Sequence, residues 1–60
     1  MNNWCIFRDG RWWVFAPAGA AVEGGWTCDV AHASLMTEDE AARWSRRVGG
    51  EPIEIEPETL

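Results

Sequence analysis

The sequence has little of what several classes of protein require. It contains no apolar run near the roughly 20 residues of a membrane-spanning helix, and no basic start followed by an apolar stretch of signal-peptide length. Two cysteines in 60 residues are too few for a disulfide scaffold. These absences predict a cytoplasmic chain that does not bind membranes and whose cysteines act as small buried hydrophobic residues.

Positive charge is also scarce. Five basic residues stand against ten acidic ones, which gives a formal net charge of −5. Because nucleic-acid binders usually show a basic excess, this balance disfavours nucleic acid as a partner. Cys5, Cys28 and His32 lack the number and spacing of a four-ligand zinc site, and so short a chain has little room for a Cys–His nucleophile in a pocket. We therefore expect no metal, no cofactor and no catalytic residue.

Residues 4–16 contain the clearest structural signal in the chain. Aromatic and β-branched runs flank an Asp-Gly pair at positions 9–10, a pattern that predicts a tight β-hairpin. A two-residue turn would pair Phe7 with Trp12, whereas a three-residue loop with a bulge would pair Ile6 with Trp12. In either register both faces of the hairpin are apolar, which is typical of strands that are covered on both sides.

The next two segments are predicted to be a loop and a strand. Residues 17–25 carry three glycines and a proline without periodicity, as loops do. Residues 26–31 alternate large apolar residues with small or polar ones. This alternation predicts a third strand that points three side chains toward the core: Trp26, Cys28 and Val30.

The C-terminal third predicts a helix and a further strand. Thr37 and Glu40 form a capping box ahead of a helix over residues 38–48, which ends at a Gly-Gly pair. Residues 52–56 alternate with period two between prolines and suit an edge strand, paired either in its own sheet or in a neighbour's. The predicted fold is α+β: one small domain with an antiparallel three-stranded meander, one helix packed on it and a short C-terminal edge strand.

Because one helix of eleven residues covers one face of such a sheet, we expect the other face to stay exposed and to form an interface. In the preferred interpretation the helix covers the side with Trp12 and Val14. In the alternative it covers the side with Trp13 and Phe15, and Trp12 and Val14 are exposed. The expected partner is a protein, either a second copy in a homodimer or a host factor. The residues predicted to bind it are Phe7, Arg8, Arg11, Trp13 and Phe15.

Two groups of charged residues suggest other functions. Arg8 and Arg11 flank the turn beside aromatic rings, and arginine with planar rings can stack on bases and contact phosphate. Carboxylates near the C-terminus form an acidic surface that can mimic nucleic-acid phosphate: Glu51, Glu54, Glu56 and Glu58. A solubilised hairpin tip and a solvated strand face explain the same residues without a ligand.

A longer pattern runs through most of the chain: Trp4-x-Ile6-x-Arg8-Asp9-Gly10-Arg11-Trp12-x-Val14, a Trp-containing strand, and Leu35-Met36-Thr37-x-x-Glu40-Ala41. This pattern resembles small uncharacterised Trp-rich proteins of actinobacterial phages and prophages. The resemblance implies a phage origin and a place in the host cytoplasm, and little about activity. The strand-strand-strand-helix order also resembles the arm-site domains of phage integrases, which read DNA with the sheet, although this chain has apolar residues where basic ones would be expected.

Overall fold

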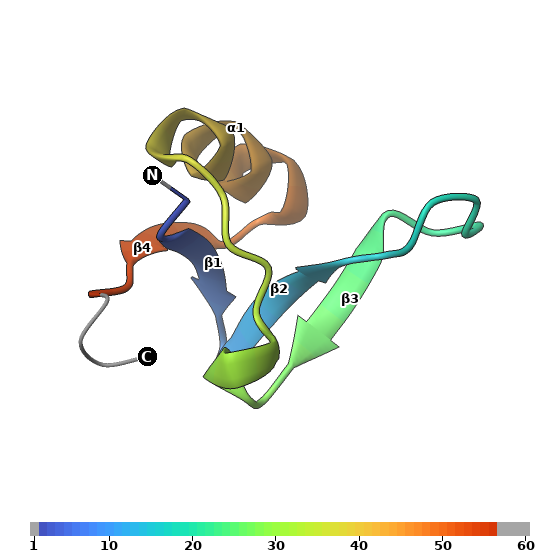
Figure 1. Cartoon of the computed structure of the whole chain (residues 1–60), viewed down its shortest axis with the longest axis horizontal. Coiled ribbons are helices and arrows are strands. Elements are labelled where there is room, and N and C mark those ends of the chain that lie inside the picture. The colour runs from blue at the N-terminus through green and yellow to red at the C-terminus, as the bar shows by residue number, and fades with distance from the viewer. Residues whose placement is uncertain (1, 57–60) are drawn as a thin grey trace.

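The computed structural model describes residues 2–56, which form a four-stranded antiparallel sheet with one α-helix on one side (Figure 1). The strand order is β3-β2-β1-β4, so the C-terminal strand pairs with β1 of its own chain. The predicted α+β arrangement is therefore confirmed. The elements are β1 Trp4–Arg8, β2 Arg11–Phe15, β3 Gly24–Thr27, the 3₁₀ helix η1 Val30–His32, α1 Glu38–Val48 and β4 Glu51–Glu54.

The β1–β2 hairpin uses the two-residue turn. Asp9 and Gly10 both have positive φ, 50° and 78°, as a type I′ turn requires. Phe7 lies opposite Trp12. Of the two predicted registers, the structure has the two-residue one, and the three-residue loop with a bulge is wrong.

Beyond this turn β1 and β2 diverge, and the segment before α1 lies between them (Figure 1). Met36 exchanges two backbone hydrogen bonds with Trp4, at 2.8 and 3.0 Å. Ser34 donates its N–H to the carbonyl of Trp13, and its hydroxyl accepts from the N–H of Phe15. Residues 34–36 thus satisfy backbone groups that β1 and β2 would otherwise satisfy for each other.

The boundaries of α1 agree with the sequence prediction. The Thr37 hydroxyl accepts from the backbone N–H of Glu40, and the Glu40 carboxylate accepts from the N–H of Thr37. At the other end Gly49 takes the left-handed conformation, with φ 86°. Ser45 is buried and donates its hydroxyl to the carbonyl of Ala42, a contact that the apolar pattern did not reveal.

The predicted boundaries of the last two strands need correction. β3 occupies Gly24–Thr27 instead of residues 26–31, because Asp29 accepts a hydrogen bond from the N–H of Ala31 and starts η1. Cys28 is consequently exposed at the surface and does not face the core. β4 likewise begins at Glu51, one residue before the predicted range, and its regular pairing ends at Glu54.

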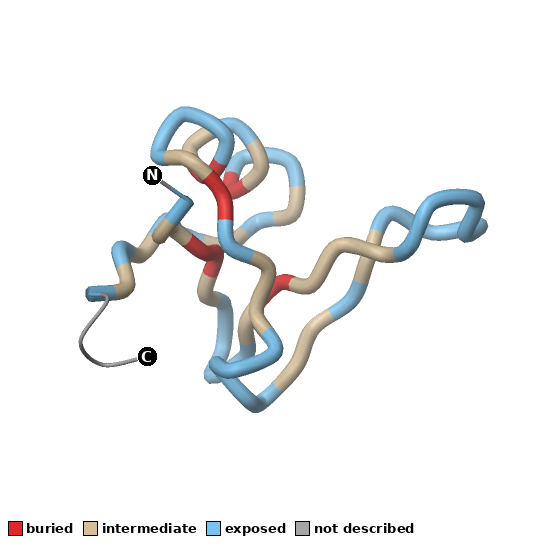
Figure 2. Tube along the Cα trace, viewed as in Figure 1, coloured by how far each residue is buried: buried red, intermediate tan, exposed pale blue. Residues whose placement is uncertain are grey.

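The buried core lies where α1, the segment before it and the centre of the sheet meet (Figure 2). It consists of Ile6, Trp13, Met36 and Ala41. We call β1, β4 and α1 the body, and we call β2, β3 and the loop over residues 17–23 the arm. The loop extends away from the body and is exposed throughout (Figures 1 and 2).

Candidate functional site

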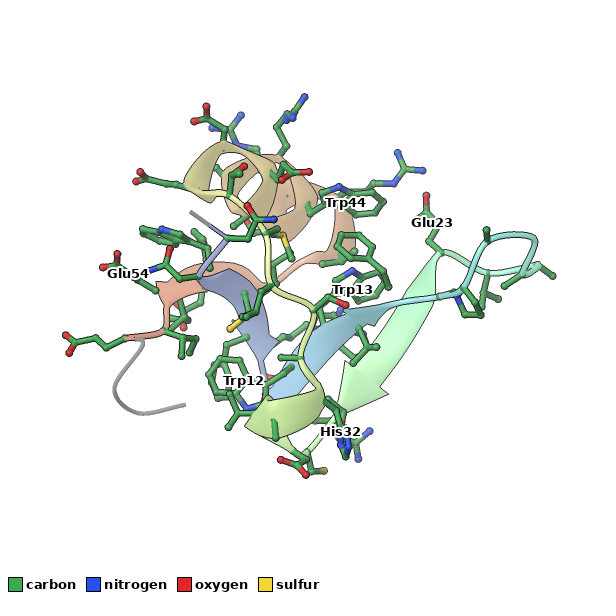
Figure 3. The ribbon with its side chains drawn as sticks, in the orientation of Figure 1. Trp12, Trp13, Glu23, His32, Trp44 and Glu54 are labelled. Carbon is green, nitrogen blue, oxygen red and sulfur yellow. The ribbon has the colours of Figure 1, made fainter. Side chains whose placement is uncertain are left out.

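Two residues predicted for the exposed interface face the helix instead. Trp13 is 5% exposed, and its ring is stacked with that of Trp44 on α1, with the ring centroids 6.2 Å apart. Phe15 meets Trp44 edge to face at 4.9 Å. The expectation of an exposed Trp13 is wrong, because α1 covers the side of β2 on which Trp13 lies (Figure 3). Phe15 also packs against Trp44 on α1 and is half-buried, so it does not belong to an uncovered face.

Trp13 is the centre of an aromatic cluster between arm and body. Its ring centroid lies 5.3 Å from that of Trp26 and 5.9 Å from that of Phe15, both in edge-to-face geometry. Its indole N–H is buried and has no hydrogen-bond partner among the described residues. The Trp13 side chain therefore stabilises the fold through the packing of its ring, and its N–H is an unsatisfied donor.

The side of the sheet away from α1 carries the complementary set of apolar residues. Phe7 and Trp12 lie opposite each other with ring centroids 4.8 Å apart. Side-chain alternation places Val14 on the same side, and Ile53 of β4 also lies there because it pairs with Cys5. Leu35 follows by alternation from the inward-facing Met36 and is 42% exposed. We call these residues the far face: Phe7, Trp12, Val14, Leu35 and Ile53.

The far face is partly sheltered by its own chain. η1 contacts β2, and Trp12 lies on the side of the sheet away from α1 (Figure 3). No tryptophan of the chain is fully exposed: Trp13 is buried and the other four are half-buried. Cys5 is 0% exposed on this side, and burial raises the pKa of its thiol, which keeps the group protonated and unreactive. The uncovered apolar surface is thus smaller than the sequence suggested.

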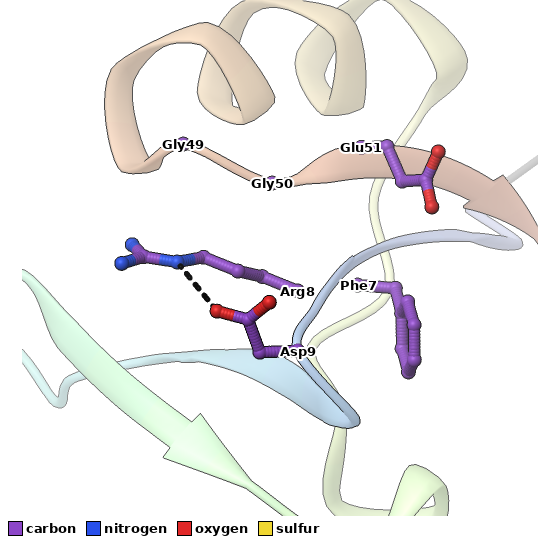
Figure 4. Close-up of a pocket in the computed structure, with 6 residues that line it drawn as sticks. All are labelled: Phe7, Arg8, Asp9, Gly49, Gly50 and Glu51. Carbon is purple, nitrogen blue, oxygen red and sulfur yellow. Dashed lines mark ion pairs between the residues drawn. The ribbon is translucent and has the colours of Figure 1, made fainter.

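Arg8 and Arg11 lie on the α1 side of the sheet, at the hairpin turn. Arg8 donates from Nη1 to the carbonyl of Val48 at 2.8 Å and so caps the last turn of α1. Figure 4 shows the Arg8 side chain next to Asp9, with which it forms an ion pair. Its guanidinium also lies over the ring of Trp26, 5.5 Å from the centroid. Arg8 therefore has a structural role, whereas the exposed side chain of Arg11 makes no hydrogen bond or ion pair within residues 2–56.

One ion pair connects the arm to the helix. Glu23, at the end of the loop, accepts a hydrogen bond from Arg47, which lowers the pKa of Glu23 and raises that of Arg47. The guanidinium of Arg47 also lies over the ring of Trp44, 5.5 Å from its centroid. Both side chains are largely exposed, so the pair contributes little to stability.

The predicted acidic surface is divided between two sides of the molecule. Glu51, Glu54 and Glu56 are exposed, and Glu58 lies outside the described residues. Glu51 pairs with Phe7 and faces away from α1, whereas Glu54 pairs with Trp4 on the other side of β4. The amide of Asn3 donates to the Glu54 carboxylate. These carboxylates therefore form no single row along the strand.

The candidate metal and redox residues do not come together. Within residues 2–56 no three side chains among His, Cys, Asp and Glu are grouped as metal ligands. Cys28 and His32 are exposed beyond β3, and His32 lies 3.3 Å from the Asp29 carboxylate. In the same part of the chain, no helix has both the length and the apolar character needed to cross a bilayer.

No family model, curated protein or solved structure matches this chain. Its function is therefore inferred from its own residues. Two surfaces stand out on opposite sides of the sheet: the far face, which carries none of the five arginines, and the arginine-bearing side around the hairpin turn and α1.

Proposed function

We propose that the chain is a non-enzymatic, phage-type accessory protein that acts by contacting a protein through the far face, and that the contacting protein is a second copy of this chain. The observation that supports this proposal is the Phe7–Trp12 ring pair on the same side of the sheet as the exposed Leu35. Aromatic residues are enriched at the centres of protein interfaces and charged residues are depleted there. The five residues of the far face have this composition, and the carboxylate of Glu51, the cross-strand partner of Phe7, lies at their border.

A second copy fits the far face because an apolar surface is complementary to itself. A two-fold axis would bring the Phe7–Trp12 pair of one copy against the same residues of the other without requiring opposite charges. Stable interfaces bury about 800 Å² on each partner, and the whole chain exposes 4193 Å². A contact of that size would take about a fifth of this surface, so we expect it to include the whole far face, and a change at the exposed rim should be enough to disrupt it.

The test is sedimentation equilibrium over a wide range of protein concentration. We expect a reversible monomer–dimer equilibrium for the wild type and a monomer for Leu35→Asp, because burying a carboxylate in an apolar contact is costly. Val22→Asp is the matched control: Val22 is 66% exposed on the loop of the arm, away from the far face. Circular dichroism checks that both variants remain folded.

A monomeric wild type at every concentration would overturn the proposed self-association and leave a host factor as the partner of the far face. An equal loss of dimer in Val22→Asp and Leu35→Asp would also contradict the proposal. It would show that added negative charge on the acidic chain, and not the far face, controls association.

A further inference from the structure

A cavity of about 310 Å³ lies beside the hairpin turn, on the side of the sheet opposite the far face. It is lined by Arg8, Asp9, Arg11 and Trp26. Arg8 and Arg11 are direct cross-strand partners, so two guanidinium groups border the same hollow. Like charges that face each other across strands destabilise a hairpin unless an opposite charge lies between them.

The described part of the chain does not neutralise these two guanidinium groups fully. The nearest carboxylate oxygen of Asp9 lies 3.7 Å from Nε of Arg8, which is too long for a hydrogen bond. Arg11 has no hydrogen bond or ion pair within residues 2–56. Each guanidinium carries five N–H donors, so donors remain unused on both sides of the cavity.

The position of Arg8 is fixed independently of any ligand. Its Nη1 is held by the carbonyl of Val48, and its guanidinium lies over the Trp26 ring. A donor held in this way loses little conformational entropy when an anion binds. The exposed Arg11, on the neighbouring strand and the same side of the sheet, can then adjust to the bound anion.

We propose that this cavity binds a phosphate-type oxyanion between Arg8 and Arg11, with the Trp26 indole as its wall. Phosphate matches the site because its oxygens accept bidentate hydrogen bonds from two guanidinium groups and its charge exceeds that of the single carboxylate of Asp9. Free phosphate and a terminal phosphate of a nucleotide share this chemistry. Asp9 and the C-terminal end of α1 oppose the anion, so we expect affinity on the order of millimolar.

The test is a titration of the full chain with inorganic phosphate, followed by ¹H–¹⁵N NMR at constant ionic strength. We expect saturable shifts of the Trp26 indole N–H and of the Nε–H groups of Arg8 and Arg11. Arg11→Gln should weaken binding by about tenfold, since one charge-assisted contact is lost. It should leave the fold intact because the Arg11 side chain holds no other group in place.

Arg46→Gln is the matched control, because Arg46 is exposed on α1 and does not line the cavity. We expect this variant to bind phosphate as the wild type does. A non-saturating titration, or equal weakening by Arg46→Gln and Arg11→Gln, would overturn the proposal. Tighter binding of a 5′-phosphorylated dinucleotide than of inorganic phosphate would identify a nucleic-acid end as the source, and equal binding would identify the free anion.

Discussion

The body and the arm of this molecule are stabilised in different ways. In the body, α1 lies against β1 and β4, and its two ends are capped by Thr37 and Gly49. The arm has no helix of its own, and its loop is exposed. It is joined to the body by the short pairing of β2 with β1, by the ring contact of Trp13 with Trp44 and by the Glu23–Arg47 ion pair. Ser34, in the segment before α1, adds hydrogen bonds to β2.

This difference shows how a 60-residue chain can stabilise a four-stranded sheet with a single helix. The body obtains its stability from continuous apolar burial, as small domains generally must. In the arm, the one buried side chain is that of Trp13, which packs between the two regions. Substitutions in the arm should therefore cost more stability the more directly they disturb the packing of Trp13.

The largest effect is expected for Trp13→Ala. Removing a buried aromatic side chain typically costs about 3–5 kcal/mol, which approaches the whole stability of so small a domain. Trp13→Phe should cost much less, because it keeps a ring in contact with Trp44 and removes an indole N–H that lacks a partner. Urea unfolding followed by circular dichroism measures both variants. Equal losses would contradict the ring-contact account and imply a hydrogen bond to the indole.

An intermediate effect is expected for Gly24→Ala in the arm. A Cβ at this position would lie 2.2 Å from the carbonyl oxygen of Val14 and 2.7 Å from the Trp13 ring, so β3 must shift. Overpacking of this kind costs about 1–3 kcal/mol. Gly25→Ala is the neighbouring control, because a Cβ there meets nothing within 4 Å. Thermal unfolding should separate the two variants; identical melting temperatures would show that β3 is not packed closely against β2.

The smallest effect is expected in the body, for Thr37→Ala. Loss of the N-cap hydroxyl costs about 1 kcal/mol. Hydrogen bonds from the Thr37 N–H and hydroxyl lower the pKa of Glu40. A lowered pKa gives stability that is present above the unfolded-state value of about 4.3 and is lost as the pH falls through the folded-state value.

The difference in stability between wild type and Thr37→Ala should therefore narrow below about pH 4. Thermal unfolding at neutral and acidic pH measures this difference. A gap that stays constant across the two conditions would show that Glu40 is not coupled to the cap.

Local signals in the sequence were enough to predict most of the fold. Asp9-Gly10 indicates the turn because both positions need positive φ, and Thr37, Glu40 and Gly49 mark the ends of α1. These features depend on residues a few positions apart. The outcome at each of them follows from backbone geometry and hydrogen bonds that any chain with the same residues would form.

The candidate site was harder to predict because it depends on contacts between distant segments. The side of the sheet that α1 covers is decided by Trp44 meeting Trp13 and Phe15, and both sides of β2 are equally apolar in sequence. The divergence of β1 and β2 depends on the pairing of Met36 with Trp4. No pattern of neighbouring residues in the sequence indicates this pairing. The start of η1 was indicated locally in the sequence, because Asp29 is a favourable N-cap residue. It ends β3 earlier than predicted.

The placement of residues 34–36 between β1 and β2 also has a consequence for cooperativity. The backbone groups of Trp4 and Trp13 find their partners only when the stretch that leads into α1 arrives from more than twenty positions further along the chain. We therefore expect the pairing of β1 and β2 with residues 34–36 and the packing of α1 on the sheet to occur together, in one cooperative step. A chain shortened to its first three strands would lack residues 34–36, which connect β1 to β2, even though it would keep the Asp9-Gly10 turn.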